Sequence, residues 1–445
     1  MARRNLDKTE YLIIGNSAGG IGAAEAIREI DTNGRLVIVS DEPYPAYSRP
    51  LISEYLSHER TTDTMLFRSP DFYDRNRIEL LSNTKIIKIS PEDRTVQFEN
   101  GTILGWQKLL LSTGGAPIIP SIKGLDKEGV FSFIKLEDAR KIDEYLPVVN
   151  RAVIIGGGLI GISVCEALSK RSVPVTVVEM KDRVLNMILD DHASNVAESI
   201  ILQHGVHVIT NNTVAEITGN GRVEGIKLSS GESIACDMVI AAIGVIPRLD
   251  LINRTGIEVN RGIIIDRQMS TSCRGIYACG DVAEGYDFIT GSSHLTPIWP
   301  NAFIGGRVAG HNMAGLTERY SGGTAMNSIN YFGIDIVSAG LVSAPAGKQY
   351  EELTYNKGSI YKKLILKNGI IKGMLFIEEI EKAGMVFGLI RDKVNVNSFK
   401  NTLLRDDFGL IDLPVKLRRE RMGILTGRKH IVPLKEADEQ PVAGE

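Results

Sequence analysis

The chain has 445 residues, and at roughly 150 residues per domain this length predicts two or three domains. Its 51 Lys and Arg nearly balance its 54 Asp and Glu, so the formal charge is −3 and the basic excess typical of a nucleic-acid binder is absent. Hydrophobic residues make up 43% and charged residues 24%, which excludes disorder over most of the chain.

The first predicted unit opens the chain. Residues 11–27 give, in turn, a short apolar strand, a glycine turn and an Ala- and Ile-rich helix. A second apolar strand at 36–39 follows and leads to the acids Asp41 and Glu42. This order is typical of a βαβ dinucleotide-binding unit. Either acid can hold a ribose, and we expect Glu42 to do so.

A hairpin is predicted next, and a second one lies further along the chain. The strand-like runs 95–98 and 108–111 flank an Asn-Gly turn at 100–101, and the arrangement recurs at 225–234 around a Ser-Gly turn. Further strands are expected at 238–242 and 262–266.

A second dinucleotide unit begins about 140 residues after the first. Residues 152–168 repeat the strand, glycine turn and helix, and the apolar strand 175–178 ends at Glu179. Glu179 follows Gly156 by 23 residues, which is where an acid bonds the ribose hydroxyls of a bound nucleotide. Its charge repels a 2′-phosphate and favours NADH over NADPH; the nearby Lys181 and Arg183 weaken that preference, although a solvated turn explains them more simply.

The two glycine turns predict two pyrophosphate sites. Glycine is needed where the backbone turns sharply and where it approaches the phosphates, and the helix that follows offers free N–H groups. Ser17 replaces the middle glycine of the first turn, and it is small enough to permit close approach. The turn residues are Gly15, Ser17 and Gly20 in the first unit and Gly156, Gly158 and Gly161 in the second.

The C-terminal part has a different pattern. From about residue 321 the chain is rich in strand-like runs, at 328–332, 361–366 and 373–377, and a helix is predicted near 381–391. The last forty residues are charged and punctuated by proline.

On the paired glycine turns and four further motifs, the chain resembles the FAD-dependent pyridine nucleotide-disulfide oxidoreductase superfamily. The resemblance implies an α/β fold, with two Rossmann-like domains for FAD and NAD(H) and a smaller C-terminal α/β domain. The four motifs are Leu110–Gly115, similar to the family's Ala-Thr-Gly strand end; Val239–Pro247, similar to its apolar-Gly-x-x-Pro segment; Thr271–Asp281, similar to its second FAD motif; and Tyr44–Ser53, similar to the segment that passes the flavin in NADH-dependent ferredoxin and rubredoxin reductases.

The resemblance also implies cofactor-binding residues. Asp281 is expected on the ribityl chain of the flavin, Arg49 and Pro50 beside the flavin, and Trp299 either over the flavin or in the core. The FAD residues are Gly15, Ser17, Ala18, Gly19, Gly20, Asp41, Glu42, Arg49, Pro50, Thr113, Gly114, Gly280, Asp281 and Trp299, and the NAD residues are Gly156, Gly158, Leu159, Ile160, Gly161, Glu179 and Gly244.

The family's disulfide-reducing branch needs a cysteine beside the flavin, and residues 41–56 contain none. The four cysteines are Cys165, Cys236, Cys273 and Cys279, and the first two are interpreted as core residues. The branch that remains passes electrons from NADH through FAD to a separate redox centre, which requires no side-chain acid or base, so no catalytic residue is assigned.

Three positions depart from the ferredoxin-reductase pattern. Glu54 stands where that group often has a lysine by the flavin, and Leu159 and Ser163 stand where it often has an aromatic residue and a glutamate. In that group, the positions of Leu159 and Ser163 help gate and hold the nicotinamide, so the details of hydride access stay undecided. The chain looks closer to the NADH-binding domain of assimilatory nitrite reductases and the NADH-dependent subunit of phenylglyoxylate dehydrogenase.

These resemblances predict an NADH:acceptor oxidoreductase that exchanges electrons with an iron–sulfur protein or subunit, as the nicotinamide module of a multi-subunit enzyme. An NADH oxidase that makes peroxide or water is the alternative, and a flavin-bound scaffold without catalysis is the second. A homodimer and a hetero-oligomer subunit both stay open. The six Lys and Arg between Lys416 and Lys429 are either a solvated face or a docking strip for an acidic partner.

The expected organisation is an FAD domain split between residues 1–118 and 246–320, an NAD domain at 119–245, a C-terminal α/β domain at 321–400 and a charged tail at 401–445. The sparse cysteines, the lack of an apolar signal segment and the lack of an apolar run long enough for a span predict a cytoplasmic protein with no membrane span. The seven histidines show no ligand spacing, so no metal site is predicted.

Overall fold

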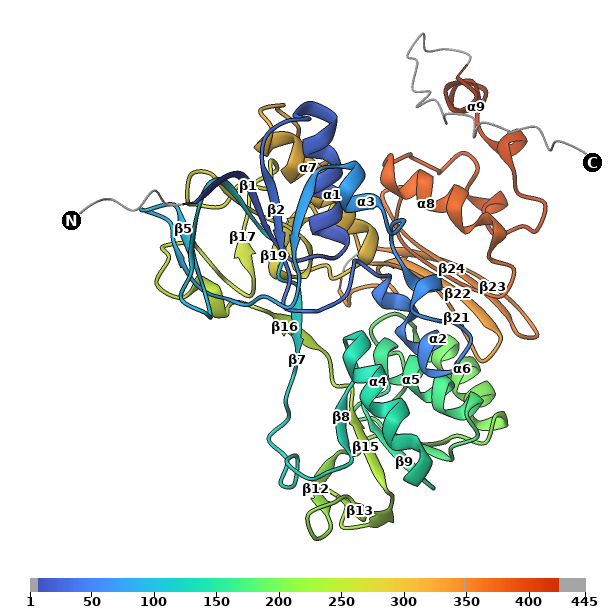
Figure 1. Cartoon of the computed structure of the whole chain (residues 1–445). Coiled ribbons are helices and arrows are strands. Elements are labelled where there is room, and N and C mark those ends of the chain that lie inside the picture. The colour runs from blue at the N-terminus through green and yellow to red at the C-terminus, as the bar shows by residue number, and fades with distance from the viewer. Residues whose placement is uncertain (1–6, 348, 424–445) are drawn as a thin grey trace, which may run out of the picture.

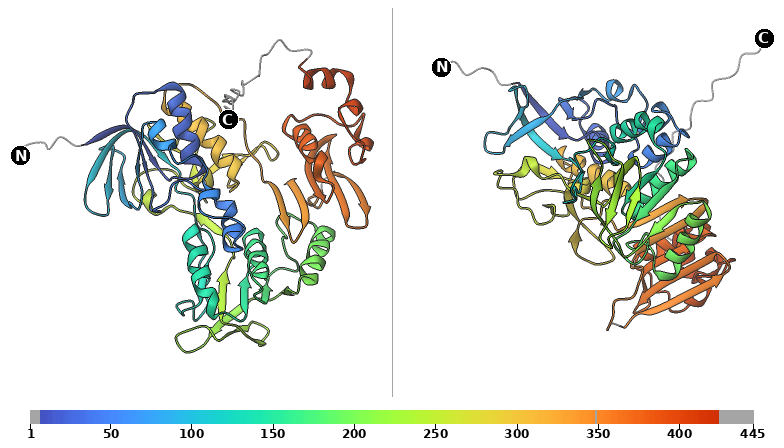
Figure 2. Two further views of the ribbon diagram at one scale, coloured as in Figure 1. Left: turned by 45° about the vertical axis from the view of Figure 1, so that its right-hand side comes forward. Right: turned by 90° about the horizontal axis from the view of Figure 1, so that it is seen from below.

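The computed structural model describes residues 7–347 and 349–423. It contains two Rossmann-type bodies and a C-terminal antiparallel sheet, which Figures 1 and 2 show as three groups of elements around a common centre. The mixed α/β fold predicted from the sequence is confirmed.

The first Rossmann body is built on a seven-stranded sheet of order β3-β2-β1-β6-β5-β4, with β18 added to β6. β1, β2, β3, β6 and β18 run parallel, and β18 brings residues from far along the chain into this sheet. The predicted hairpin around the Asn-Gly turn is β5 and β6. The strands are β1 (Lys8–Ile14), β2 (Leu36–Val39), β3 (Ile78–Leu81), β4 (Ile86–Ser90), β5 (Thr95–Phe98), β6 (Ile103–Leu111) and β18 (Ile276–Ala278).

Two helices of this body touch through glycines. α1 (Ala18–Ile30) and α7 (Trp299–Met313) approach so closely that a Cβ on Gly306 would lie 2.0 Å from the carbonyl oxygen of Gly19, and one on Gly310 would lie 2.3 Å from that of Ala23. Only glycine permits this approach. Two short helices, α2 (Ile52–Leu56) and α3 (Phe72–Arg75), follow the second strand.

The second Rossmann body has a five-stranded parallel sheet of order β11-β10-β9-β15-β8, with three helices and a three-stranded antiparallel sheet. The second predicted hairpin is β13 and β14. Its elements are β8 (Val130–Ser132), α4 (Leu136–Tyr145), β9 (Ala152–Ile155), α5 (Leu159–Lys170), β10 (Val175–Val178), α6 (Asp191–Gln203), β11 (His207–Ile209), β12 (Val214–Thr218), β13 (Gly225–Leu228), β14 (Ser233–Ala235) and β15 (Met238–Ala241).

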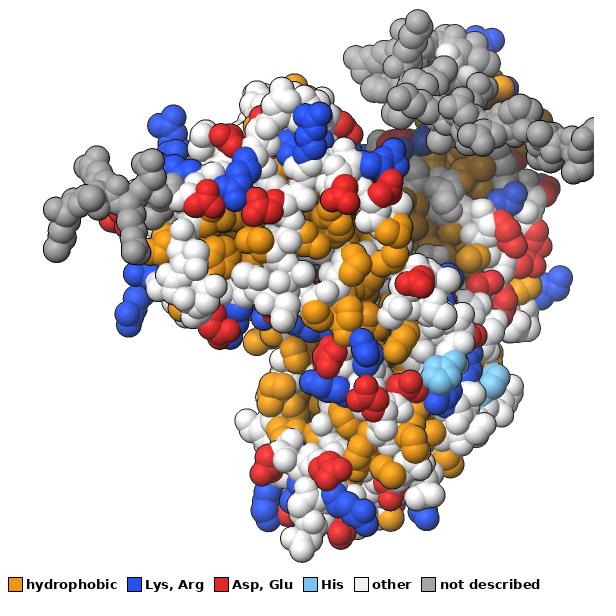
Figure 3. Space-filling model, viewed as in Figure 1, with side chains coloured by type: hydrophobic (Ala, Val, Ile, Leu, Met, Phe, Trp, Pro, Cys, Tyr) orange, Lys and Arg blue, Asp and Glu red, His pale blue; other side chains and the backbone are white. Residues whose placement is uncertain are grey.

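The chain crosses between the two bodies on a two-stranded antiparallel ribbon. β7 (Gly115–Pro117) leaves the first body and β16 (Val245–Pro247) returns to it. Figure 3 shows apolar side chains gathered where the bodies meet, with charges of both signs around them. A small sheet of β17 (Ile263–Ile264), β19 (Ala283–Tyr286) and β20 (Ser293–His294) follows the return.

The C-terminal sheet packs on two different partners. Its side chains alternate between faces, as in any strand: Ile336 and Leu375 belong to the apolar core shared with the second Rossmann body, whereas Val337 and Phe376 pack with α8. The order is β21-β22-β25-β24-β23, and the elements are β21 (Met326–Tyr331), β22 (Ile334–Gly340), β23 (Glu351–Lys357), β24 (Ile360–Lys367), β25 (Ile370–Ile377), α8 (Ala383–Arg391) and α9 (Val415–Arg421).

Some predicted boundaries differ from the structure. The strand expected at 328–332 ends one residue earlier, because Phe332 and Gly333 form the turn to β22 with φ of 52° and 84°. Two positive φ values are what a tight two-residue hairpin turn requires. The strand expected at 262–266 shortens to Ile263–Ile264, and β22 and β23 were not predicted. Among the described residues no helix combines the length and apolar character of a membrane span.

Candidate functional site

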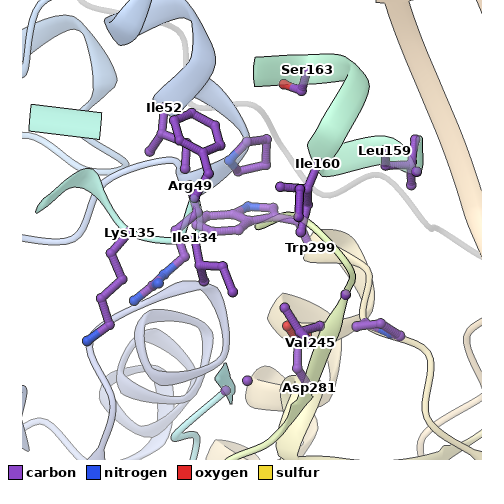
Figure 4. A pocket seen from close by; sticks show the side chains of 18 of the residues that line it. Arg49, Ile52, Ile134, Lys135, Leu159, Ile160, Ser163, Val245, Asp281 and Trp299 are labelled. Carbon is purple, nitrogen blue, oxygen red and sulfur yellow. The ribbon is translucent and has the colours of Figure 1, made fainter. Parts of the chain in front are cut away.

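A cavity of about 1650 Å³ lies between the two Rossmann bodies and the C-terminal sheet. Both glycine turns open into it, so two dinucleotides have one shared space in which to meet. Figure 4 shows side chains from both bodies converging there, with Arg49 and Lys135 on one side, Ile160 opposite, and Asp281 and Val245 below.

The first glycine turn has the geometry of a pyrophosphate site. Gly15 has φ of 119°, and a Cβ on it would lie 2.1 Å from the carbonyl oxygen of Ser112; one on Gly20 would lie 1.9 Å from the oxygen of Gly15. Ser17 is the N-cap residue of α1, yet its side chain makes no capping hydrogen bond, and the first turn contains no acid. The amides at the start of α1 are therefore available for an anion.

The second glycine turn repeats these contacts. A Cβ on Gly156 would lie 2.5 Å from the oxygen of Ala242, and one on Gly161 would lie 1.9 Å from the oxygen of Gly156. Gly158 differs, because a Cβ on it would meet no protein atom within 4 Å. Glycine at this position leaves open space at the start of α5, as a bound pyrophosphate requires. The residues of both turns thus fit a dinucleotide.

Glu179 is fixed beside the second turn. Its carboxylate is buried and accepts hydrogen bonds from the amide of Gly157 at 2.6 Å and from the amide of Lys181 at 2.8 Å. The acid predicted for ribose binding therefore lies next to the pyrophosphate site, on the cavity wall.

The two acids of the first unit have different surroundings. Glu42 is buried, and its two oxygens accept from the hydroxyl of Tyr47 at 2.7 Å and from the guanidinium of Arg49. Asp41 is more exposed, and Lys135 at 3.3 Å and Arg248 at 3.0 Å both contact its Oδ2. These cations hold the pKa of Asp41 below its usual range against the effect of burial.

Asp281 reaches the cavity from the short 3₁₀ turn Gly280–Val282. Burial raises the pKa of its carboxyl, and the charge of Arg49 opposes that shift. The N-cap residue of the turn is Cys279, so Asp281 is not placed to cap it. Asp281 is half-buried, and a carboxylate that faces a cavity in this way is free to accept from a ligand hydroxyl.

Trp299 begins α7 and lines the cavity, with its ring edge-on to that of Phe67 at 5.1 Å. Figure 4 shows it between the side chains of the two bodies, near Ile160. Of the two readings left open by the sequence, the structure places this tryptophan at the cavity.

Most of the residues predicted for the site line this cavity. Gly20 and Gly161 do not, because each packs against the first glycine of its own turn. The residues that do are Gly15, Ser17, Ala18, Gly19, Asp41, Glu42, Arg49, Pro50, Thr113, Gly114, Gly280, Asp281, Trp299, Gly156, Gly158, Leu159, Ile160, Glu179 and Gly244.

Several lining residues were not predicted. Lys135 reaches the cavity from the N-cap position of α4, Arg248 from the position after β16, and Tyr331 from the C-terminal sheet. Arg248 directly follows the Val239–Pro247 motif without being part of it, and no motif surrounds Lys135 or Tyr331. Each becomes a site residue only through the way the three parts assemble.

No cysteine is among the described residues that line the cavity. Burial is the main cause that raises the pKa of Cys165, Cys236 and Cys279 to about 12. A thiol of that kind is inert as a nucleophile at neutral pH. The site therefore offers two nucleotide cradles without a described thiolate between them.

Two family models match the chain. The model described as pyridine nucleotide-disulphide oxidoreductase matches residues 9–303, and the model of the rubredoxin NAD+ reductase C-terminal domain matches residues 326–394. The resemblance predicted from the sequence is confirmed.

Curated relatives and solved structures agree with these models. The chain is 28% identical over 404 residues to the NADH-dependent phenylglyoxylate dehydrogenase subunit epsilon of Aromatoleum evansii, covering 89% of this chain and 95% of that protein. It is 28% identical over 394 residues to the NAD(P)H nitrite reductase of Bacillus subtilis, covering 88% of this chain but 48% of that protein, so the chain spans about half that relative's length. The NAD-dependent persulfide reductase from A. fulgidus has a TM-score of 0.83 and 27% identity, covering 88% of this chain and 78% of that chain.

Proposed function

Since the chain belongs to the pyridine nucleotide-disulphide oxidoreductase family, we propose that it exchanges a hydride between NADH and FAD and electrons with an iron–sulfur protein, as the nicotinamide-linked module of a multi-subunit redox enzyme. It is an oxidoreductase with FAD and NAD(H) as cofactors, and electrons pass from NADH through FAD to a carrier. The multi-subunit setting and the partner are the proposed part.

The observation that carries the proposal is the single cavity into which both cradles open without a described cysteine in its lining. FAD, when bound, takes up electrons in pairs as a hydride and releases them singly. A thiol-dependent reduction of a disulfide or persulfide would need a thiolate here, and the segment 41–56 provides none.

The chain's residues bind and orient the two nucleotides in this proposal. The amides at the start of α1 and α5 bind the pyrophosphates, and Glu179 accepts from the ribose hydroxyls of NADH. Asp281 accepts from the ribityl hydroxyls of FAD. Trp299 and Ile160 line the region where the reacting rings would meet and exclude water from it.

For the ribose of FAD we favour Asp41 over Glu42, which revises the sequence-based preference. Each oxygen of Glu42 already accepts one hydrogen bond, from Tyr47 or from the charged Arg49. Less acceptor capacity is left there than on Asp41, because the two cations on Asp41 contact only its Oδ2. Within the described residues, Oδ1 of Asp41 is left for the ribose.

An iron–sulfur partner is supported by the kinship of the C-terminal part with a rubredoxin reductase domain and by the name of the relative that is a dehydrogenase subunit. A basic strip on α9 offers a docking surface for an acidic carrier. Lys416 and Arg419 are exposed, whereas Arg421 is paired with Asp392. Arg428 and Lys429, which belong to the same predicted strip, lie outside the described residues.

The test begins with anaerobic mixing of the FAD-loaded protein with NADH, followed at the flavin absorbance band. Rapid bleaching is expected, and then reoxidation by an added rubredoxin or ferredoxin faster than by oxygen. Reoxidation by oxygen alone would establish the NADH oxidase alternative, and NADH binding without bleaching would establish the scaffold. Purification of the native complex should return a subunit with iron–sulfur clusters.

A further inference from the structure

The hairpin of β21 and β22 reaches the start of the second nucleotide cradle. The hydroxyl of Tyr331 donates to the carbonyl oxygen of Leu159 at 3.1 Å, and the amide of Phe332 donates to Oε1 of Glu166 at 3.1 Å. The ring of Phe332 lies 5.1 Å from that of His204. A hairpin of the C-terminal sheet is therefore fixed on α5 by side-chain and backbone contacts.

Tyr331 is half-buried and faces the cavity as well as the helix. Its hydroxyl donates to Leu159, and the side chain of Ser163 is a hydrogen-bond partner beside it. The oxygen of Tyr331 keeps a further acceptor site for a ligand. Burial, followed by the charge of Glu166, raises the pKa of Tyr331 strongly, so the hydroxyl keeps the proton that it donates.

The glycine turn has a hydrogen-bonded side chain on each flank, and these two contacts indicate which end of the nucleotide Tyr331 would face. Glu179 is bonded to Gly157 and marks the adenosine side. Tyr331 is bonded to Leu159, on the other flank of the turn, where Ile160 faces the first body in Figure 4. That flank leads from the pyrophosphate toward the nicotinamide end.

The same flank lacks two side chains that the resembling reductases often carry, because Leu159 and Ser163 stand in their places. A tyrosine offers an aromatic face that can cover a flat ring and a hydroxyl that can bond an amide. The C-terminal hairpin brings such a side chain to that place.

We propose that Tyr331 is a nicotinamide-binding residue, which the C-terminal sheet of the same chain adds to the glycine turn. Its hydroxyl accepts a hydrogen bond from the carboxamide N–H of NAD(H). The assignment rests on the proposed function, in which the nicotinamide end of this cradle faces the flavin. It makes the docked hairpin a part of the NADH site.

The test compares NAD+ with ADP-ribose, which lacks the nicotinamide, as ligands of the FAD-loaded protein in calorimetry. Tyr331→Phe should weaken NAD+ binding by roughly three- to tenfold, the size of one neutral hydrogen bond, and leave ADP-ribose binding unchanged. Tyr355→Phe, on β23 of the same sheet and outside the cavity lining, is the matched control and should change neither.

A second ligand sharpens the result. The 3-acetylpyridine analogue of NAD+ lacks the amide N–H, so Tyr331→Phe should bind it as the wild type does. Equal weakening of NAD+ and ADP-ribose binding would overturn the assignment, because Tyr331 would then only support α5. Unchanged NAD+ binding would overturn it as well, because Tyr331 would then have no role in binding. If the wild type binds NAD+ as expected but NADH does not reduce its flavin, the proposed function is overturned instead.

Discussion

The amide of Gly157 donates a 2.6 Å hydrogen bond to the carboxylate of Glu179, and this bond joins the second glycine turn to the acid that follows β10. A second amide, that of Lys181, holds the other carboxylate oxygen. The acid is thus held on the cavity wall before a nucleotide arrives, so little conformational freedom is lost when a ribose binds.

The first prediction concerns the choice of nicotinamide cofactor. Glu179→Ala should weaken NADH binding by about 1–3 kcal/mol, because charge-assisted hydrogen bonds to the ribose diol are lost. NADPH should be affected less, since the carboxylate that repels its 2′-phosphate is also removed. Steady-state kcat/KM for both cofactors measures the change. A wild type that uses NADPH as readily as NADH would contradict the assignment.

The second prediction compares two glycines of one turn. Gly158→Ala adds a Cβ in open space at φ of −81°, so the melting temperature should stay unchanged while NAD(H) binding weakens at least tenfold, by roughly 1.4 kcal/mol or more. Gly161→Ala places a Cβ 1.9 Å from the oxygen of Gly156 and should lower the melting temperature by several degrees. Scanning calorimetry and ligand titration separate the two effects. Equal loss of stability in both variants would show that Gly158 serves packing.

These residues also show how far the sequence reaches. Gly158 and Glu179 were predicted because both belong to a motif whose spacing is set by one strand, turn and helix. Asp281 was implied by the resemblance of residues 271–281 to the family's second FAD motif. Lys135 and Tyr331 were not, because they reach the cavity only after segments remote in sequence have packed together. No local periodicity reports such an assembly.

The elements of the fold also differ in how well the sequence predicts them. The buried parallel strands β1 and β9 are apolar runs that the sequence shows plainly. β23 is an edge strand in which every residue is exposed or half-buried, and its Glu351, Glu352, Asn356 and Lys357 carry little strand signal. The turn at Phe332 was missed because a bulky aromatic residue rarely adopts a positive φ.

The third prediction concerns the flavin site. Asp281→Ala should yield protein with little bound FAD, because the carboxylate that accepts from the ribityl chain is lost. The ratio of flavin absorbance to protein absorbance after purification measures this. Full FAD content at normal thermal stability would mean that Asp281 has no role in binding.

In the protein without FAD, Asp281→Asn should increase the thermal stability at neutral pH, whereas Asp281→Ala should reduce FAD binding. Burial raises the pKa of Asp281 in the folded chain, so the folded state binds this proton more tightly than the unfolded state and loses stability as pH rises above the ordinary carboxyl range. Asn removes that loss. The melting temperature of the FAD-free variant relative to wild type should therefore increase between about pH 4 and pH 7. A difference that does not depend on pH would contradict this account.

The fourth prediction concerns thiols. With pKa values near 12, Cys165, Cys236 and Cys279 are almost entirely protonated at pH 8, and all three are buried. Alkylation under native conditions should modify chiefly Cys273, which is half-buried. NADH reduction of FAD and transfer to ferricyanide should survive that treatment, because no step in the proposed mechanism uses a thiolate.

Substitution of the four cysteines by Ala or Ser completes this test. It should lower the melting temperature more than the turnover number, since Cys279 contacts the tightly packed region where a Cβ on Gly19 would lie 2.8 Å from its Sγ. Coenzyme A disulfide and glutathione disulfide should not be turned over by either protein. A wild type that reduced such a disulfide, and lost that activity on alkylation while still reducing ferricyanide, would overturn the assignment of the cysteines. It would require a thiolate to reach the flavin from outside the segment 41–56. Cys165 lies on the buried side of α5 within the apolar core of the second body, which leaves that residue no path to do so.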